Sequence, residues 1–381
     1  MQSHASRHVA SEFLKDRHPD LSPPFPSGVI PDEIAEAYGR KGVVKLVNVL
    51  SLPASDLSDE KRAHALRVLI GLLSTQEQKL DAVSVGGCAA LTTLVKEFEH
   101  AEVLRLSCEA LGSLAQVQQG RVAIVTCGGV TALDAALEAS PSAAAGALRT
   151  FAFSCDGAQL LGNFLEPVVP SLAATIDRAA ADTDGMRACI NAATALASLC
   201  TTDAGILSCL KHYVPACIVR LAGRCLTGDF KFESDLNECY EAVADCLEQI
   251  AHQKYGKTAV REAGAIPVLA QLLEVAQWHA ATVKKATAAL MATSVEKDSK
   301  LPIVESAGAA LVRLLKSSDE ANVPNARATL VSCAEHLPAR AQLGSHLNAA
   351  EQVVLLFQGP LPPTPPDFRY EVRLPYKTGD E

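Results

Sequence analysis

The amino-acid sequence predicts an all-α solenoid, a right-handed superhelix of about seven to eight three-helix units. A glycine–proline–leucine phrase returns along the chain and is clearest at residues 263–273, which read AGAIPVLAQLL. Its last apolar residue recurs at successive spacings of 45, 42, 39, 45, 52, 42 and 41 residues. These eight positions are Leu50, Val95, Leu137, Ile176, Leu221, Leu273, Leu315 and Leu356. A period of roughly 40–47 residues is typical of armadillo and HEAT repeats.

The composition agrees with close-packed helices. Hydrophobic residues make up 49% of the chain and aromatic residues only 4%, while alanine and leucine are abundant. The formal net charge of -9 argues against nucleic acid or an anionic membrane as the main partner, leaving room only for a local basic patch.

The phrase divides each unit into three expected helices. The first covers residues 256–263 in one copy and 120–127 in another, and each stops at the following glycine, which tolerates positive φ. The second opens near a proline, where the missing N–H costs nothing: Pro170, Pro215 and Pro267. The third is the longest. A separate short first helix favours armadillo over HEAT repeats.

The sequence predicts three regions. Residues 1–30 read as an irregular N-terminal arm, residues 31–358 as the solenoid, and residues 359–381 as a proline-rich extended tail. There is no apolar segment typical of a signal peptide or a membrane span, and the twelve cysteines include no CxxC pair. We therefore expect a soluble intracellular protein with reduced structural thiols.

Motifs for catalysis or cofactor binding are missing from the sequence. No Walker A, GxGxxG after a strand, HExxH or GxSxG motif occurs, and the glycine pairs at 86–87 and 128–129 recur at the repeat period as helix stops. Cys209 and His212 form only half of a zinc spacing, and Asp245 with Glu248 is typical of a solvated face. We expect no enzyme, no cofactor, no metal and no small-molecule substrate.

The third helices are expected to line a groove for another protein. The positions that flank the central leucine of each third helix are mostly small or charged, and they carry no ladder of Trp and Asn like that of the nuclear-import adaptors. They are Arg67 and Gly71, Glu109 and Ser113, Gly146 and Thr150, Thr194 and Ser198, Asp245 and Gln249, Ala288 and Ala292, and Ala328 and Ser332. The pattern favours a folded or helical partner; the alternative is a groove that is merely solvated.

Two further segments are candidate contact surfaces. The 52-residue spacing places an insertion at residues 227–234 with Phe230 and Phe232, either a partner contact or a tolerated loop. In the tail, Phe368, Tyr370, Leu374 and Tyr376 lie on one face of an alternating segment. The tail is expected either to cap the last unit or to bind a neighbouring protein.

Four short segments resemble armadillo-repeat proteins of ciliary radial spokes, the family of the radial spoke head 14 homolog. They are PDEIAEAYG at 31–39, RAHAL at 62–66, VGGC at 85–88 and GRV at 120–122. The resemblance is best over residues 31–135, and the proline-rich tail has no counterpart in it.

This resemblance implies a non-catalytic structural subunit of a radial spoke in the axoneme of a motile cilium or flagellum, bound to other spoke proteins. The alternative is a cytosolic armadillo co-chaperone or adaptor that wraps a folded partner such as the Hsp70 nucleotide-binding domain. Those co-chaperones have fewer repeats than the eight copies found here.

Overall fold

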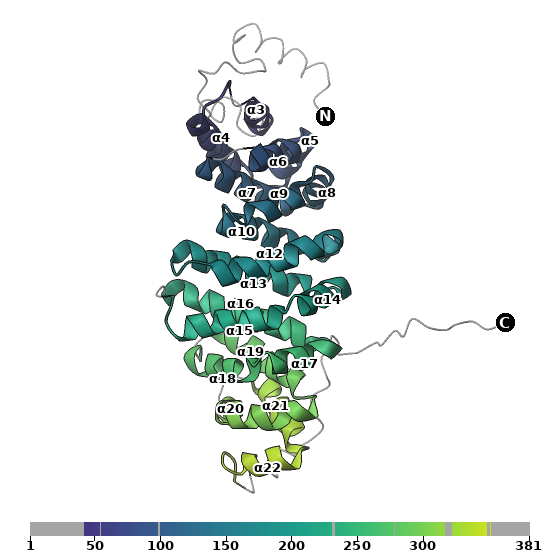
Figure 1. Ribbon diagram of the computed structural model, residues 1–381, viewed down its shortest axis with the longest axis vertical. Coiled ribbons are helices and arrows are strands. Elements are labelled where there is room, and N and C mark those ends of the chain that lie inside the picture. The colour runs from purple at the N-terminus through teal and green to yellow at the C-terminus, as the bar shows by residue number, and fades with distance from the viewer. Residues whose placement is uncertain are drawn as a thin grey trace, which may run out of the picture.

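The computed structural model describes residues 42–351, except 54, 98–99, 231–232, 278, 317–321 and 349–350. Within these residues the regular elements are helices, and no strand occurs. They stack along one long axis, from α3 and α4 at one end to α22 at the other (Figure 1). The expected all-α solenoid is confirmed, while both predicted terminal arms lie outside the described residues.

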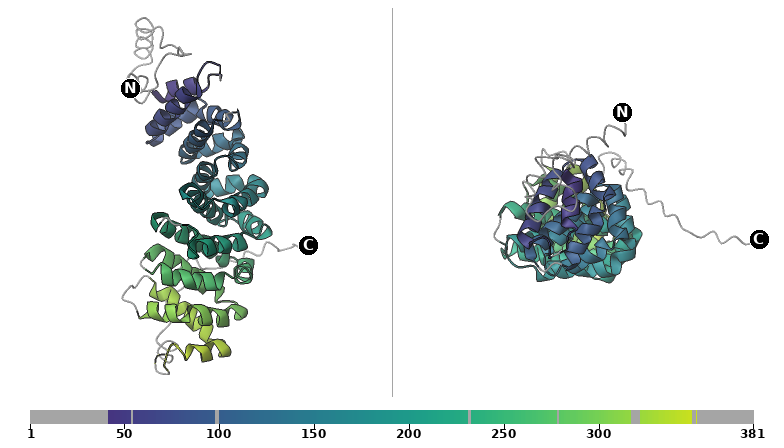
Figure 2. Two further views of the ribbon diagram at one scale, coloured as in Figure 1. Left: turned by 60° about the vertical axis from the view of Figure 1, so that its left-hand side comes forward. Right: turned by 90° about the horizontal axis from the view of Figure 1, so that it is seen from above.

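Seven third helices form one continuous layer of the stack, since each contacts the third helix of the next unit. They are α4 (Asp59–Leu72), α7 (Ala101–Ala115), α10 (Pro141–Ala152), α13 (Thr183–Leu199), α16 (Glu233–His252), α19 (Ala280–Thr293) and α21 (Val323–Ala334). The side view in Figure 2 shows the units following one another with little overlap between distant ones.

The second helices form a parallel layer in the same way. They are α3 (Gly42–Leu50), α6 (Gly87–Glu97), α9 (Gly129–Ala136), α12 (Leu165–Arg178), α15 (Val214–Leu226) and α18 (Ala265–Val275). The recurring apolar position packs each of these six helices against the core. Five of its copies are almost fully buried, and Val95 is slightly less so. Of the two remaining copies, Leu315 is half-buried at the end of a later helix, and Leu356 lies outside the described residues.

The first helices are short and join one unit to the next. They are α5 (Gln76–Ser84), α8 (Gln118–Thr126), α11 (Cys155–Leu160), which runs into the 3-10 turn η3 (Leu161–Phe164), α14 (Asp203–Lys211), α17 (Lys254–Glu262) and α22 (Leu337–Leu343). Both α8 and α17 begin two residues before the predicted glycine start. Gly120 and Gly256 are instead the third helical residues, where a Cβ would collide with the carbonyl oxygen of Leu114 or Ile250 in the preceding third helix.

The predicted glycine stops occur in three units, between the first and second helices. Gly86, Gly128 and Gly264 take φ values of 84°, 75° and 78°, and each ends a first helix and begins a second. In the seventh unit Ser306 stands at this register and the chain continues through it as one helix, α20 (Lys297–Leu315). In this unit the two helices are fused where the glycine is missing, whereas in the fifth unit Tyr213 takes positive φ and α14 and α15 stay separate.

The prolines follow the prediction at two of three places. Pro215 and Pro267 lie in the first turns of α15 and α18, but Pro170 lies inside α12. The prediction that Pro170 opens its helix is wrong. The helix instead begins at Leu165, more than one turn before Pro170, and the proline in its first turn is Pro167, where the missing N–H costs nothing.

Buried cations of the first helices make links both within a unit and between units. Lys79 donates to Gln116 Oε1, and Lys300 donates to Glu335 Oε2 at 2.7 Å, in each case to the residue that caps the end of the third helix of the same unit. Arg121 instead reaches the first helix of the next unit, with its Nη2 2.6 Å from Asp156. These contacts therefore fix the first helices against the end of their own unit and against the following one.

Candidate functional site

The third-helix face is the surface on which the predicted contact residues gather. Arg67 on α4 is exposed, and half-buried pairs follow on α7, α13 and α16: Glu109 and Ser113, Thr194 and Ser198, Asp245 and Gln249. The expected helix phase therefore holds along most of the layer. On α19 the phase also holds, since Leu290 is fully buried as predicted, but the flanking Ala288 and Ala292 are buried with it because their short side chains do not reach solvent beside α16 and α21.

The hydroxyl groups of this face are occupied by their own helices. Ser113 Oγ donates to Glu109 O at 3.1 Å, Thr150 Oγ1 to Gly146 O at 2.9 Å, and Thr194 Oγ1 to Ile190 O at 2.8 Å. Such back-bonding to the fourth residue before is common for Ser and Thr in helices. With their protons donated to backbone carbonyls, these hydroxyls lie as polar, self-satisfied groups on an open helix face.

Most charges of the face are paired between successive units. Arg67 Nη2 lies 2.8 Å from Glu102 Oε1, and this hydrogen bond is the main cause that lowers the pKa of Glu102. Asp245 lies 3.1 Å from Lys285 Nζ on the next third helix. The predicted contact residues Arg67 and Asp245 therefore also hold the stack together.

A hollow opens between α7, α10 and α13, with a volume of about 300 Å³. It brings together four of the predicted positions: Glu109, Ser113, Gly146 and Thr150. The helices approach closely here because Gly112 and Gly146 have no side chains. A Cβ on Gly112 would lie 3.2 Å from Ala147 Cα, and one on Gly146 would lie 3.1 Å from Asn191 Nδ2.

A second hollow of about 590 Å³ continues the first and shares four lining residues with it: Gln116, Gly146, Thr150 and Asn191. We call the two together the third-helix trough. The second part adds Arg149 and Phe153, and the Phe153 side chain is 81% exposed. Sequence reasoning missed Arg149, Phe153 and Asn191. The sequence does carry a signal for Phe153, because it is an aromatic residue four positions after Arg149 at the end of a predicted third helix.

The insertion between the second and third helices of the fifth unit lies where it was predicted, between the ends of α15 and α16. The prediction that Phe230 contacts a partner is wrong, because its side chain is only 1% exposed. Its ring lies 4.6 Å from the Arg224 guanidinium and anchors the loop in the core. The other predicted aromatic contacts lie outside the described residues: Phe232, Phe368, Tyr370, Leu374 and Tyr376.

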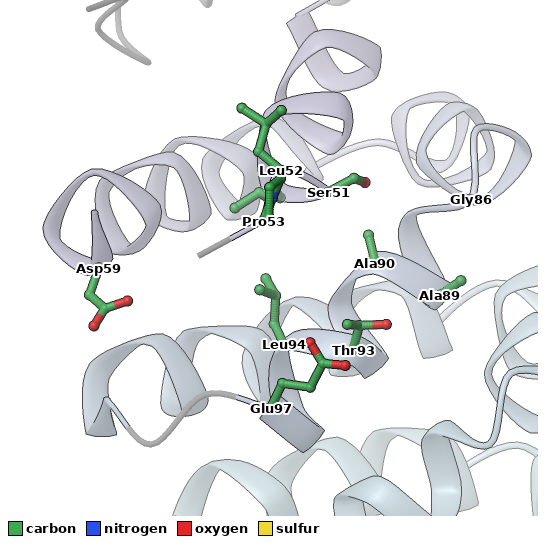
Figure 3. Close-up of a pocket in the computed structure, with 11 residues that line it drawn as sticks. Ser51, Leu52, Pro53, Asp59, Gly86, Ala89, Ala90, Thr93, Leu94 and Glu97 are labelled. Carbon is green, nitrogen blue, oxygen red and sulfur yellow. The ribbon is translucent and has the colours of Figure 1, made fainter. Parts of the chain in front are cut away.

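A larger cavity of about 670 Å³ lies at the junction of the first two units (Figure 3). Leu52 and Pro53 of the loop after α3 form one wall, and Thr93, Leu94 and Glu97 of α6 form the other. Ser51 in the same loop donates to Val47 O at 2.8 Å. This cavity contains none of the predicted contact positions, whereas the third-helix trough brings four of them together, so the trough is the stronger candidate.

Metal and thiol chemistry find little support among the residues that the structure describes. Among them no group of three or more His, Cys, Asp or Glu side chains could hold a metal ion. All twelve cysteines are free, and burial raises the pKa of Cys88 and Cys108 to about 12. At neutral pH these buried thiols are protonated and therefore poor nucleophiles and ligands.

The acidic pair Asp245 and Glu248 does not form a dyad, because the two carboxylates have separate partners. Glu248 lies 3.3 Å from His252 Nε2, whereas Asp245 is paired with Lys285.

Within the described residues no single helix is long and apolar enough to cross a membrane. One pair of helices, α14 with α15, is long and apolar enough when taken together, but the two helices are bent by 70° relative to each other.

Solved structures resemble this chain in fold. An engineered protein is 23% identical, with a TM-score of 0.66 over 88% of this chain and 78% of its own. A structure concerned with a phosphorylation switch in the interaction of cadherin with β-catenin is 16% identical, with a TM-score of 0.65 over 90% of this chain and 72% of its own. A designed armadillo repeat protein in complex with the peptide (KR)4 is 19% identical, with a TM-score of 0.53 over 65% of this chain and 99% of its own.

These likenesses establish the armadillo-repeat fold. No family model matches the chain, and no curated protein matches it either.

Proposed function

We propose that this chain is a non-catalytic scaffold that binds another protein along its third-helix face, at the third-helix trough. The observation that carries the proposal is the meeting of Glu109, Ser113, Gly146 and Thr150 in one hollow beside an exposed Phe153. The designed armadillo repeat protein with its bound peptide supports the idea that a stack of this kind can hold another chain.

The chemistry of the trough suits recognition by shape. Small side chains and glycines let the backbone or a helix of a partner approach closely, as they do where helices pack. An exposed aromatic ring offers a large apolar area, and such residues are frequent among those that dominate binding energy. Because most neighbouring charges are already paired, a partner would have few ions to desolvate.

We further propose that the partner is a radial spoke subunit in the axoneme of a motile cilium or flagellum. The support is the order and spacing of the four short segments that resemble the radial spoke family. Three of them lie in the described residues: Arg62 is buried in α4, Gly86 ends a first helix, and Arg121 binds the next unit.

The test places a photo-cross-linking amino acid at Ser113 or Thr150 of the full chain in ciliated cells, with Leu80 on a first helix as the control position. Salt-washed axonemes are then analysed by mass spectrometry. We expect cross-links to spoke proteins from positions 113 and 150 and none from position 80.

Absence of the chain from salt-washed axonemes would overturn the ciliary part of the proposal. Cross-links from position 80 alone would overturn the choice of face. Recovery of Hsp70 in a nucleotide-sensitive manner would favour the co-chaperone alternative instead.

A further inference from the structure

Arg149 has a different kind of partner from Arg67, Arg187 and Lys285, the paired cations of the same face. Those three each lie within 3.2 Å of a carboxylate oxygen on a neighbouring unit. Arg149 Nη1 instead donates to the amide oxygen of Asn191 at 3.1 Å. Among the described residues no carboxylate lies within ion-pair distance of its guanidinium.

Asn191 holds this guanidinium without neutralising it. The Asn191 side chain is only 8% exposed, and its Nδ2 donates to Ser142 O at 3.0 Å on the preceding third helix. The amide orientation is therefore fixed from both sides, with its oxygen toward Arg149. A neutral acceptor leaves the positive charge of the arginine available for a charge-assisted hydrogen bond with a carboxylate, which is stronger than a neutral one.

Phe153 lies one turn after Arg149, so both side chains project on the same side of α10 and line the same hollow. Its ring is 81% exposed. The trough thus offers an oriented, uncompensated cation next to an open apolar surface.

The other ions near the trough are already matched. Arg121 lies 2.6 Å from Asp156, and the hydrogen bond from Arg121 is the main cause that lowers the pKa of Asp156. Glu109 is paired with Arg105 on its own helix. Among the described side chains that line the trough, the charge without a carboxylate partner is that of Arg149, so the trough is locally positive although the whole chain carries a net charge of -9.

We propose that the third-helix trough recognises a protein segment in which a carboxylate side chain lies beside an apolar one. The carboxylate binds Arg149, and the apolar side chain packs on Phe153. This inference rests on the proposed function and specifies its partner, because a basic segment would meet the uncompensated charge of Arg149 as a repulsion.

The test begins with a random twelve-residue peptide library displayed on phage, selected on the full chain and counter-selected on the Arg149→Glu variant. One enriched peptide is then synthesised with a fluorescent label, together with versions in which its acidic residues become Gln or Lys. Affinities are measured by fluorescence anisotropy at low and high salt.

We expect the enriched peptides to combine acidic with aliphatic or aromatic residues. Arg149→Gln should weaken the acidic peptide by about tenfold or more, since hydrogen bonds to charged groups contribute on the order of 1.5–3 kcal/mol. Phe153→Ser should also weaken it, and Arg149→Glu should favour the Lys version. Lys284→Gln, which removes an exposed cation of α19, is the matched control and should change nothing.

Enrichment of basic peptides, no enrichment at all, or equal binding by wild type and Arg149→Gln would each overturn the inference. The cross-links from Ser113 and Thr150 test the proposed function separately. Cross-links that persist in the Arg149→Glu variant would leave the binding face standing and remove only the acidic partner.

Discussion

The Nη1 atom of Arg62 donates to the carbonyl oxygen of Leu50 at 3.0 Å, which joins α4 to the end of α3. Its Nη2 donates to Leu52 O at 3.1 Å and Pro53 O at 3.3 Å, so one buried guanidinium holds the loop that forms a wall of the first cavity. Burial is the main cause that lowers the pKa of Arg62. The bonds therefore have to offset the cost of burying a cation.

Arg62→Met should keep the volume of the site but leave the four carbonyl oxygens that accept from Arg62 without this donor. We expect a loss of about 2–3 kcal/mol of stability in the first unit, as is usual for bonds to charged groups. Hydrogen exchange should accelerate over residues 50–58, and urea unfolding should shift to lower concentration. Arg67→Met, on the exposed face of the same helix, should have a smaller effect because exposed ion pairs contribute little. Equal effects of the two variants would contradict the role of Arg62.

Leu290→Ala tests the predicted phase of α19. Leu290 is fully buried, so truncation should leave a cavity and cost on the order of 2–5 kcal/mol. The check is urea unfolding monitored by circular dichroism. Leu337→Ala, at a leucine that is mostly exposed on α22, is the control and should cost little. A loss below about 0.5 kcal/mol for Leu290→Ala would mean that α19 does not pack as described.

The repeat period and the helix phase could be predicted from the sequence because local residues dictate them. Gly264 permits positive φ, and Leu273 closes a buried face, so the unit boundaries follow from short-range rules. The fused helix α20 was not foreseen, because the glycine of that unit has moved two residues, to Gly308. Pro170 was misplaced because another proline, Pro167, occupies the first turn of α12.

The site was predicted only in part, for a physical reason. The register of a third helix places Ser113 and Thr150 on the open face, and the structure confirms both positions. The special state of Arg149 depends on Asn191, which belongs to the next unit and lies 42 residues away. Likewise Phe230 reads as a loop aromatic in the sequence, and only the folded chain brings it against Arg224.

Tyr213 is the one residue other than glycine with positive φ among the described residues, at 54°. It lies in the turn between α14 and α15, which corresponds to the turns that hold Gly128 and Gly264 in other units. Its side chain is 77% exposed. An L-residue in this region costs roughly 1–2 kcal/mol. Because the exposed ring contributes little packing, Tyr213→Gly should raise stability by up to about 1 kcal/mol, once the extra freedom of glycine in the unfolded chain is counted.

Differential scanning calorimetry would show Tyr213→Gly as a higher Tm, whereas Gly264→Tyr, the reverse exchange at the equivalent turn, should lower it. A lower Tm for Tyr213→Gly would show that the ring makes a stabilising contact, contrary to its exposure.

The buried thiols predict that stability falls in alkaline solution. Burial is the main cause that raises the pKa of Cys88, Cys108, Cys189 and Cys333 to about 12, whereas an unfolded cysteine titrates near 8.5. Between these pH values the folded state keeps protons that the unfolded state loses. The thiols therefore leave the free energy of unfolding undiminished below about pH 8.5 and lower it progressively as the pH rises toward 12. Each thiol should contribute a slope of about 1.4 kcal/mol per pH unit.

Urea unfolding of wild type and Cys108→Ala at pH 8, 9 and 10, under reducing conditions, would measure this slope. The variant should lose stability less steeply than wild type by about one thiol's share, and lysine titration cancels in the comparison; parallel slopes would refute the assignment.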